Sequence, residues 1–414
     1  MNLYGTIILL AMVLQHALNV SADVLNIKAL ASELPEEMRG VYDVEKYRKS
    51  QDYTRVRTTF GLLSSTFSIS VTLLFWFSGG FDFLDQVVRG WGLSSILSGL
   101  CYFGILGLLK GLLSLPFSAY ATFVIEARFG FNKSTPAIYL MDMIKGVLLS
   151  LALGGPILAA VLAFFGSAGS DAWLYAWGLA IAYLLFIQLV APTWIMPLFN
   201  QFKPLEAGEL KEKIMALADA VHFPLKNVFV IDGSKRSSKS NAFFTGYGKN
   251  KRIALYDTLI ETQSVPELVA ILAHEIGHYK KKHVIQGMIF SILQIGFMLF
   301  LLSIMIGRPG LYGAFYMQTP SVYTGLIFFG MLFSPIEYFL SFCMNMLSRK
   351  NEYEADRFAV KTVGRPDTMV AALKKLAAHN LANLTPHPIY TLLNASHPPL
   401  LERIRAIRAV SPSP

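Results

Sequence analysis

Seven long apolar segments limit what this chain can fold into more than any other feature of its sequence. Each has about 20 residues or more, the length that an α-helix needs to cross the hydrocarbon core of a bilayer. The chain is 54% hydrophobic and only 15% charged, which is typical of a membrane protein rather than a soluble one. We therefore predict a mainly α, polytopic membrane protein with seven transmembrane helices, at 3–23, 60–80, 93–119, 147–166, 172–192, 285–306 and 322–346.

The positions of the basic residues predict how these helices are oriented. A net charge of +9 also occurs in proteins that bind nucleic acid, so the distribution of the charge decides its interpretation. If all seven segments cross the membrane, every Lys and Arg except Arg89, Lys110 and Arg308 lies in segments on one side of it. The positive-inside rule makes that side cytoplasmic and the N-terminus external, and no nucleic-acid partner is expected. Although Val20-Ser21-Ala22 resembles a signal-peptide cleavage site, no Lys or Arg precedes the first segment, so a retained anchor is predicted.

A His-Glu-x-x-His motif lies in a mostly apolar, helical stretch before the sixth segment. His274 and His278 are four residues apart, so they share one face of a helix and can bind the same metal ion. Glu275 then lies beside the open coordination position, where it can act as general base. Ser264 and Glu267 have the spacing of a capping box, which supports a helix that begins there. The motif indicates a hydrolase with one catalytic Zn2+ per chain.

The third metal ligand is predicted directly after the last apolar segment. A catalytic zinc normally has three protein ligands, and the motif supplies two. Glu352 and Asp356 are four residues apart on a predicted helix, so Glu352 can reach the metal while Asp356 accepts a hydrogen bond from the far ring nitrogen of a ligand histidine. Two neighbours are given no part in the site: His283, which an offset of five turns off the metal face, and Glu354, which points elsewhere.

A small α+β module is predicted between the fifth segment and the motif. A helix is expected over 206–221, and three short β-like runs follow at 228–231, 241–245 and 252–256. Zinc peptidases commonly hold an extended substrate against a strand edge by main-chain hydrogen bonds. The candidate edge, for which a purely structural strand is the alternative, consists of Asn241, Ala242, Phe243 and Phe244.

Further motifs occur in a fixed order along the chain. The full set is Gly130-Phe-Asn-Lys133, Pro197-Leu-Phe-Asn200, Ser240-Asn-Ala242, His274-Glu275-Ile-Gly-His278, Ser348-Arg349-x-x-Glu352-x-x-Ala355-Asp356 and Ser396-His397-Pro398-Pro399. This set resembles the type I CAAX prenyl protease family of membrane zinc metallopeptidases. The resemblance implies a barrel of seven helices around a large chamber, capped by the zinc domain. It also implies cleavage at C-terminal CAAX-type tails and, in eukaryotic members, a second cut in a prenylated precursor.

The resemblance also bears on two residues near the C-terminus. In the related enzymes the histidine that matches His397 lies near the zinc, so His397 is expected to stabilise the oxyanion of the tetrahedral intermediate. For Arg403 two roles stay open. It can bind a carboxylate of the substrate, or it can pair with acidic residues near Glu352.

These features divide the chain into four predicted parts. Transmembrane helices 1–5 occupy 1–193, where a soluble helical hairpin is expected at 24–59. The module with the HExxH helix occupies 194–284, transmembrane helices 6 and 7 occupy 285–346, and the helical remainder of the small α+β zinc metallopeptidase domain occupies 347–414.

The predicted function is that of an integral-membrane zinc endopeptidase. Its expected partners are the lipid bilayer and a peptide or protein substrate, with or without a prenyl group, and a monomer is expected. Two alternatives stay open: a general quality-control protease without prenyl specificity, and a metal-binding transporter whose intramembrane polar residues form a relay. The absence of a C-terminal dilysine retrieval signal favours a bacterial inner membrane over the endoplasmic reticulum.

Overall fold

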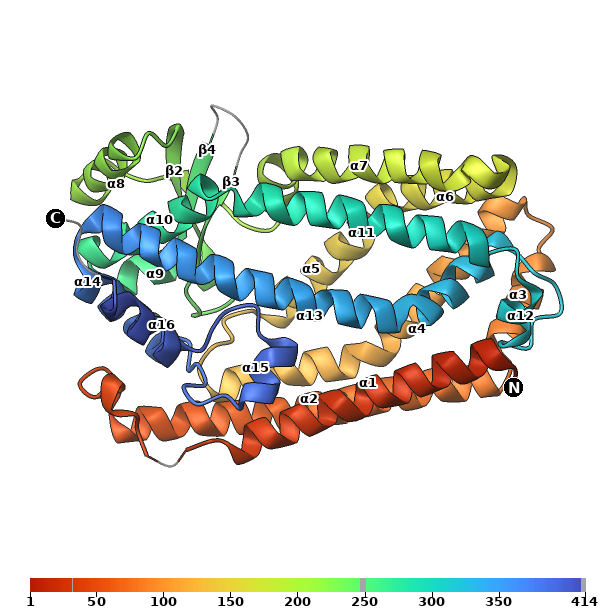
Figure 1. Cartoon of the computed structure of the whole chain (residues 1–414), viewed down its shortest axis with the longest axis horizontal. Coiled ribbons are helices and arrows are strands. Elements are labelled where there is room, and N and C mark those ends of the chain that lie inside the picture. The colour runs from red at the N-terminus through yellow and green to blue at the C-terminus, as the bar shows by residue number, and fades with distance from the viewer. Residues whose placement is uncertain (32, 246–250, 411–414) are drawn as a thin grey trace.

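The computed structural model describes residues 1–31, 33–245 and 251–410. Within these ranges, seven helical segments are long and apolar enough to cross a membrane, and each overlaps one predicted segment. Most of them extend along the long axis of the molecule (Figure 1). The segments are Leu3–Lys28 (α1), Val44–Phe77 (α2), Ser95–Glu126 (α4 with η2), Pro136–Ser167 (α5, η3 and α6), Gly169–Leu198 (α7 with short turns), His283–Met305 (α11) and Val322–Val363 (α13).

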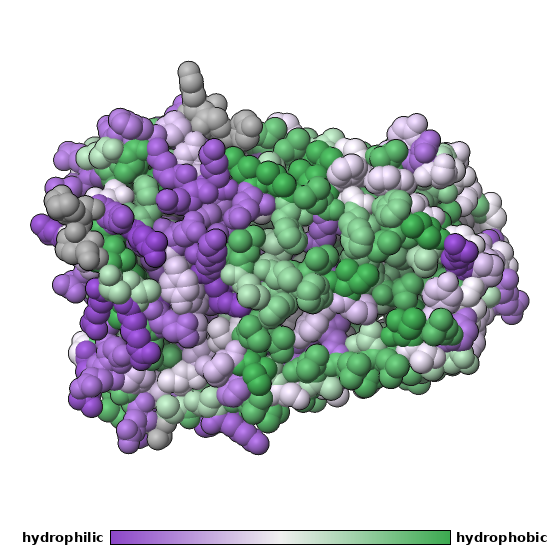
Figure 2. Space-filling model, in the orientation of Figure 1, coloured by the Kyte–Doolittle hydropathy of each residue, from purple (hydrophilic) through white to green (hydrophobic). Residues whose placement is uncertain are grey.

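Hydrophobic side chains cover the middle of the molecule over these helices, whereas hydrophilic side chains gather at the end that carries the sheet (Figure 2). Many of the apolar side chains are highly exposed; Leu112 and Leu148, for example, are 65% and 60% exposed. Water would disfavour so large an apolar surface, but lipid does not. The predicted polytopic membrane protein is confirmed.

The connection between the first two spans is shorter than predicted. α1 continues to Lys28, and α2 begins at Val44 after Asp43, whose carboxylate accepts a hydrogen bond of 2.6 Å from the backbone N–H of Lys46. The predicted soluble hairpin at 24–59 is therefore wrong. Many of its polar, helix-forming residues instead lengthen the two membrane helices, and of the described residues between them only Glu36–Met38 form a regular turn, of the 3-10 type.

Three spans contain π-helical turns: Ala121–Glu126 (η2), Ser150–Gly154 (η3) and Ala191–Ile195 (η5). η3 separates α5 (Pro136–Leu149) from α6 (Gly155–Ser167), whose second residue is Pro156. Because proline lacks a backbone N–H and clashes with the preceding turn, the α-helical hydrogen-bond pattern cannot pass through it unchanged.

Aromatic packing closes the end of the molecule farthest from the sheet, where α3 (Gly80–Arg89) and α12 (Pro309–Gly313) lie (Figure 1). Trp76 stacks on Phe315 at a centroid distance of 4.6 Å, and Phe315 stacks on Phe328 at 3.9 Å. The indole N–H of Trp76 donates a hydrogen bond of 2.8 Å to the carbonyl of Ala314. These contacts tie α2, the α12 region and α13 together.

The described part of the sheet has four strands in the order β1-β2-β4-β3. β1 (Phe202–Pro204) pairs antiparallel with β2 (Leu225–Ile231), β2 pairs parallel with β4 (Lys251–Tyr256), and β3 (Ala242–Thr245) pairs antiparallel with β4. The three predicted strands are confirmed. β1 was not predicted, because three residues that end in proline give no alternating pattern.

The sheet belongs to a module that also contains helices. They are α8 (Glu209–Ala220), α9 (Asp257–Thr262), α10 (Val265–Lys280), α14 (Pro366–His379), α15 (Pro388–Asn394) and α16 (Leu400–Arg408). One apolar core joins the sheet, α8, α10 and the helices that follow the last span; its buried members include Ile214, Leu255, Leu272, Ala359 and Leu373. α13 runs unbroken from the membrane into this core, across the predicted boundary at residue 347, and 411–414 lie outside the described residues.

α10 packs closely against α13, and this contact positions the site. A Cβ atom on Gly277 would lie 3.2 Å from both the Cα and the carbonyl oxygen of Ala355. A larger residue would crowd the backbone of α13 here, so glycine allows the two helices to approach closely at this position. The approach places the HExxH face of α10 beside Glu352, one turn before Ala355.

Candidate active site

α10 presents the two histidines of the motif on one face. It begins with the predicted capping box, in which the backbone N–H of Ser264 donates a hydrogen bond of 2.7 Å to Glu267. The Nε2 atoms of His274 and His278 lie 3.2 Å apart, so both rings point to the same place. This is the arrangement that the four-residue spacing predicts.

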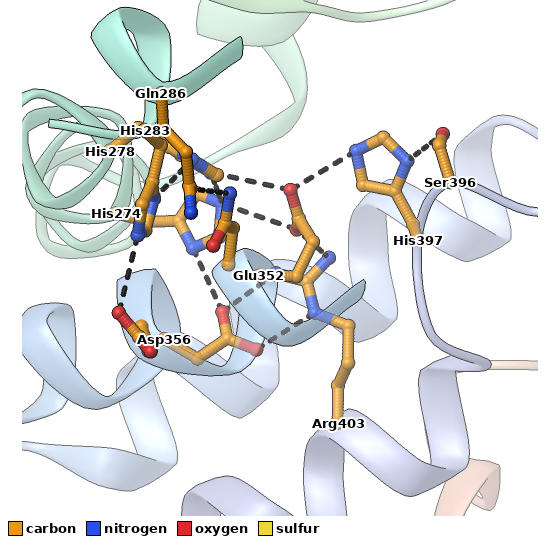
Figure 3. Close-up of polar contacts among 11 residues, drawn as sticks. His274, His278, His283, Gln286, Glu352, Asp356, Ser396, His397 and Arg403 are labelled. Carbon is orange, nitrogen blue, oxygen red and sulfur yellow. Dashed lines mark hydrogen bonds and ion pairs between the residues drawn. The ribbon is translucent and has the colours of Figure 1, made fainter. Parts of the chain in front are cut away.

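Glu352 reaches the histidines from α13. Its Oε2 atom lies 3.5 Å from His274 Nε2, and its Oε1 atom lies 3.3 Å from His278 Nε2. Figure 3 shows these three side chains pointing toward one another. The structure thus brings the three predicted ligands together, although two membrane spans separate Glu352 from α10 in the sequence.

The three residues fit a zinc ion. Ligand atoms at 2.0–2.1 Å from a tetrahedral zinc lie about 3.3 Å from one another, and the distances between the three side chains are 3.2, 3.3 and 3.5 Å. Glu352 Oε2 is buried and accepts no hydrogen bond from the described residues, so it retains lone pairs for a metal. Two imidazoles and a carboxylate are also the ligand types of catalytic zinc.

Asp356 and Arg403 support the cluster from behind (Figure 3). Asp356 Oδ1 lies 2.9 Å from Nδ1 of His274, the far ring nitrogen, as predicted. Arg403 donates two hydrogen bonds to Asp356, of 2.8 and 2.6 Å, and its Nη1 atom lies 3.3 Å from Glu352. Of the two roles left open for Arg403, the geometry favours pairing with these acids. Its assignment as a substrate-binding residue is not supported, because its planar fork is already occupied.

Burial and the neighbouring carboxylates shift the pKa values of the residues in the site. Burial lowers the pKa of His274, but the adjacent carboxylates of Asp356 and Glu352 outweigh this effect and raise that pKa to about 9. A metal has to displace this proton, so metal binding weakens as the pH falls. Burial raises the pKa of Glu275, which forms no hydrogen bond or ion pair with the described residues. An unpaired carboxylate of raised pKa beside the ligands is well suited to accept a proton.

The structure also brings His397 to the ligands, from the loop between α15 and α16 (Figure 3). Its Nε2 atom lies 3.3 Å from Glu352 Oε1, and its Nδ1 atom lies 2.9 Å from the Ser396 hydroxyl. The side chain is 64% exposed, so one side of the ring is accessible to a substrate. The ring thus lies beside the ligands, whereas its predicted oxyanion role stays a prediction.

His283 was not predicted to belong to the site. An offset of five turns a residue off the metal face only in an unbroken helix, but Lys282 has a left-handed backbone (φ 60°) between α10 and α11. The break turns the His283 ring back toward His278, and their Nδ1 atoms lie 3.1 Å apart. Nε2 of His283 lies 3.3 Å from Glu354, so Glu354 is also part of this cluster. His283 thus contacts the ring nitrogen of His278 that faces away from the other ligands.

Replacing His283 with Ala should therefore weaken metal binding. The residue that holds the far nitrogen of a ligand histidine fixes its tautomer and orientation, and its loss typically lowers metal affinity by about 10–100-fold. Competition with a zinc chelator measures this change in the purified protein. Lys281→Ala, an exposed change in the same turn, is the control and should leave the affinity unaltered. Equal affinities of the His283→Ala variant and the unmodified protein would contradict the positioning role.

β3 is an edge strand of the described sheet, because it pairs only with β4. It contains Ala242, Phe243 and Phe244, and Asn241 precedes it directly. The Asn241 side chain accepts a hydrogen bond of 2.9 Å from the backbone N–H of Ala242. The predicted edge exists, whereas its contact with a substrate stays a prediction.

Comparisons with known proteins identify the family. Residues 23–201 match the model of the five-membrane-helix N-terminal part of CAAX prenyl proteases, and residues 204–411 match that of peptidase family M48. The chain is 37% identical to "CAAX prenyl protease 1 homolog" of Oryza sativa, over 98% of this chain and 97% of that protein. It belongs to the CAAX prenyl protease family of M48 peptidases.

Two further relatives cover nearly the whole of this family member. "CAAX prenyl protease 1" of Saccharomyces cerevisiae is 37% identical over 93% of this chain and 90% of that protein. The crystal structure of S. mikatae Ste24p superposes with a TM-score of 0.93 at 34% identity, covering 98% of this chain and 99% of that one. The CAAX prenyl protease family member described here is therefore a membrane metalloendopeptidase, and the alternative of a metal-binding transporter is set aside.

Proposed function

We propose that this protein is a zinc endopeptidase that cleaves CAAX-type C-terminal tails of prenylated proteins or peptides. The observation that carries the proposal is the convergence of His274, His278 and Glu352 on one point, in a chain whose relatives carry the name CAAX prenyl protease over nearly their whole length. We propose that these three residues bind one zinc ion per chain. The ion would supply Lewis acidity to a water molecule and to the scissile carbonyl.

The roles of the other residues follow from their positions. Glu275 accepts the proton of the attacking water and passes it to the leaving nitrogen. His397 donates a hydrogen bond to the oxygen that becomes negative in the transition state. Asp356, which Arg403 holds by two hydrogen bonds, fixes the orientation of His274. The edge of β3, preceded by Asn241, is the proposed binding strand for the extended substrate.

We further propose a membrane-embedded monomer with an external N-terminus. The basic segments and the catalytic module then share the cytoplasmic side, as the positive-inside rule requires. The division into parts at 1–193, 194–284, 285–346 and 347–414 belongs to the same proposal. A bacterial inner membrane stays a prediction, and the eukaryotic sources of the relatives named above weigh against it.

Matched peptides test the proposed substrate. The purified protein should cut a CAAX peptide that carries an isoprenoid on its cysteine with a kcat/KM well above that for the same peptide without the lipid, and a zinc chelator should abolish both activities. Product masses identify the bond that is cut. Equal rates with the two peptides would instead favour the general quality-control protease without prenyl specificity.

A further inference from the structure

A cavity of about 740 Å³ borders the active site and extends to the N-terminal helices. Its walls include His397 and Arg403 on one part and Tyr53 and Arg57 of α2 on another. α15 lies between α13 and the pair α1 and α2 in Figure 1. The volume is in the range of pockets that enclose small ligands, and the last four residues of a protein tail are a ligand of that size.

Three cations line this cavity, and two of them are neutralised. Arg403 is paired with Asp356, and Lys239 is paired with Glu126, whose carboxylate lies 2.8 Å from its ammonium group. Arg57 has no carboxylate within 4.0 Å among the described residues. Its guanidinium carbon lies 6.0 Å from the centroid of the Tyr53 ring. Arg57 is thus the cation of the described wall that remains free to bind an anion.

Among the described residues, the one negative charge that also lines the cavity, that of Asp23, leaves Arg57 able to bind an anion. Asp23 of α1 also lines the cavity, but it forms no ion pair with Arg57 within the described chain. Arginine presents a planar fork of N–H donors that matches a carboxylate in two parallel hydrogen bonds. An anionic group that enters from the active-site side would therefore find its strongest partner in Arg57.

A CAAX-type tail brings such a group to the site. It ends in an α-carboxylate four residues from the start of the motif, and four extended residues reach at most about 14 Å. A tail whose scissile bond lies beside His397, and which extends into the cavity that His397 lines, would carry its terminal charge along the walls of that cavity. No other part of such a tail carries an obligatory negative charge.

We infer that Arg57 binds the α-carboxylate of the substrate and is a specificity-determining residue for the C-terminal tail. The inference rests on the proposed CAAX substrate. For cleavage at the CAAX tail, a cation in the cavity beside the metal ligands favours a free C-terminus, and it fixes how many residues from that end this cut falls. The metal site supplies the chemistry, and Arg57 sets the register of the substrate.

Two peptides with the same prenylated CAAX sequence test this inference, one with a free C-terminal carboxylate and one with a carboxamide. The unmodified full-length protein should cut the free acid with a kcat/KM about 10–100-fold higher, the discrimination expected of a hydrogen-bonded charge. In Arg57→Gln the two values should converge, chiefly through slower cleavage of the free acid. Arg57→Lys should keep part of the preference, because it retains the charge without the fork.

Arg55→Gln is the matched control. Arg55 lies two residues away on α2 and is paired with Asp52 at 3.4 Å, so its loss should leave the ratio intact. An unchanged ratio in Arg57→Gln, or an equal slowing of both peptides, would overturn the inference, because either result means that Arg57 does not sense the carboxylate. Failure of the unmodified protein to cut any CAAX peptide would instead overturn the proposed substrate itself.

Discussion

Replacing Glu275 with Gln should leave the zinc content of the purified protein unchanged and lower kcat by about 10²–10⁴-fold, the usual contribution of a general base. Glutamine has nearly the same size but cannot accept the proton of water. Glu275 makes no hydrogen bond or ion pair with the described residues, so the change breaks no contact of the fold there. Metal analysis and hydrolysis of a prenylated CAAX peptide measure the two effects on one sample.

Glu261→Gln provides the control for this experiment. Glu261 is an exposed carboxylate on α9, in the same module, and its removal should change neither metal content nor rate. Cleavage at the normal rate by Glu275→Gln would show that another group takes the proton. Loss of zinc in that variant would mean that Glu275 takes part in holding the metal.

The membrane architecture was predictable because a bilayer imposes a length on every apolar helix. All seven spans follow from that requirement, but their polar extensions do not. The polarity of the residues after 23 suggested a separate hairpin. The helix caps instead determine that α1 ends at Lys28 and that α2 begins at Val44. The chamber came only from the family resemblance and stays a prediction.

The metal site was predictable where its residues lie on one helix. The four-residue spacings of His274 with His278 and of Glu352 with Asp356 each place two side chains on one face. The contact between the two helices could not be derived from those spacings. It depends on the close approach at Gly277, which only the assembled structure reveals.

Residues that reach the site after a helix break, or from a distant part of the chain, were not predictable. His283 was excluded by a helical-offset argument that fails at the left-handed Lys282. In the sequence, Arg57 resembles any other basic residue of a polar segment. Only the structure shows that it lines the cavity beside His397 and has no carboxylate partner among the described residues. In both cases the missing information is the direction of a side chain after the chain has turned.

Replacing Glu352 with Ala should remove the metal itself. Two imidazoles alone bind zinc weakly, and losing a ligand should lower affinity by more than the roughly 10–100-fold that follows the loss of a ligand's hydrogen-bond partner. Activity should fall with occupancy and recover in part with excess zinc. Dialysis against a chelator followed by metal analysis measures this loss. The fold should survive, because Arg403 keeps its two hydrogen bonds to Asp356.

Glu402→Ala is the control for Glu352→Ala, since Glu402 is an exposed acid of α16 whose carboxylate accepts a hydrogen bond of 3.1 Å from Tyr353. It should retain full metal content. The Glu275 and Glu352 variants together separate proton transfer from metal binding. Glu275→Gln should be inactive although it keeps its zinc, and Glu352→Ala should be inactive because it has lost its zinc. Full zinc occupancy in Glu352→Ala would move the third ligand to another group, such as Asp356 on the same helix.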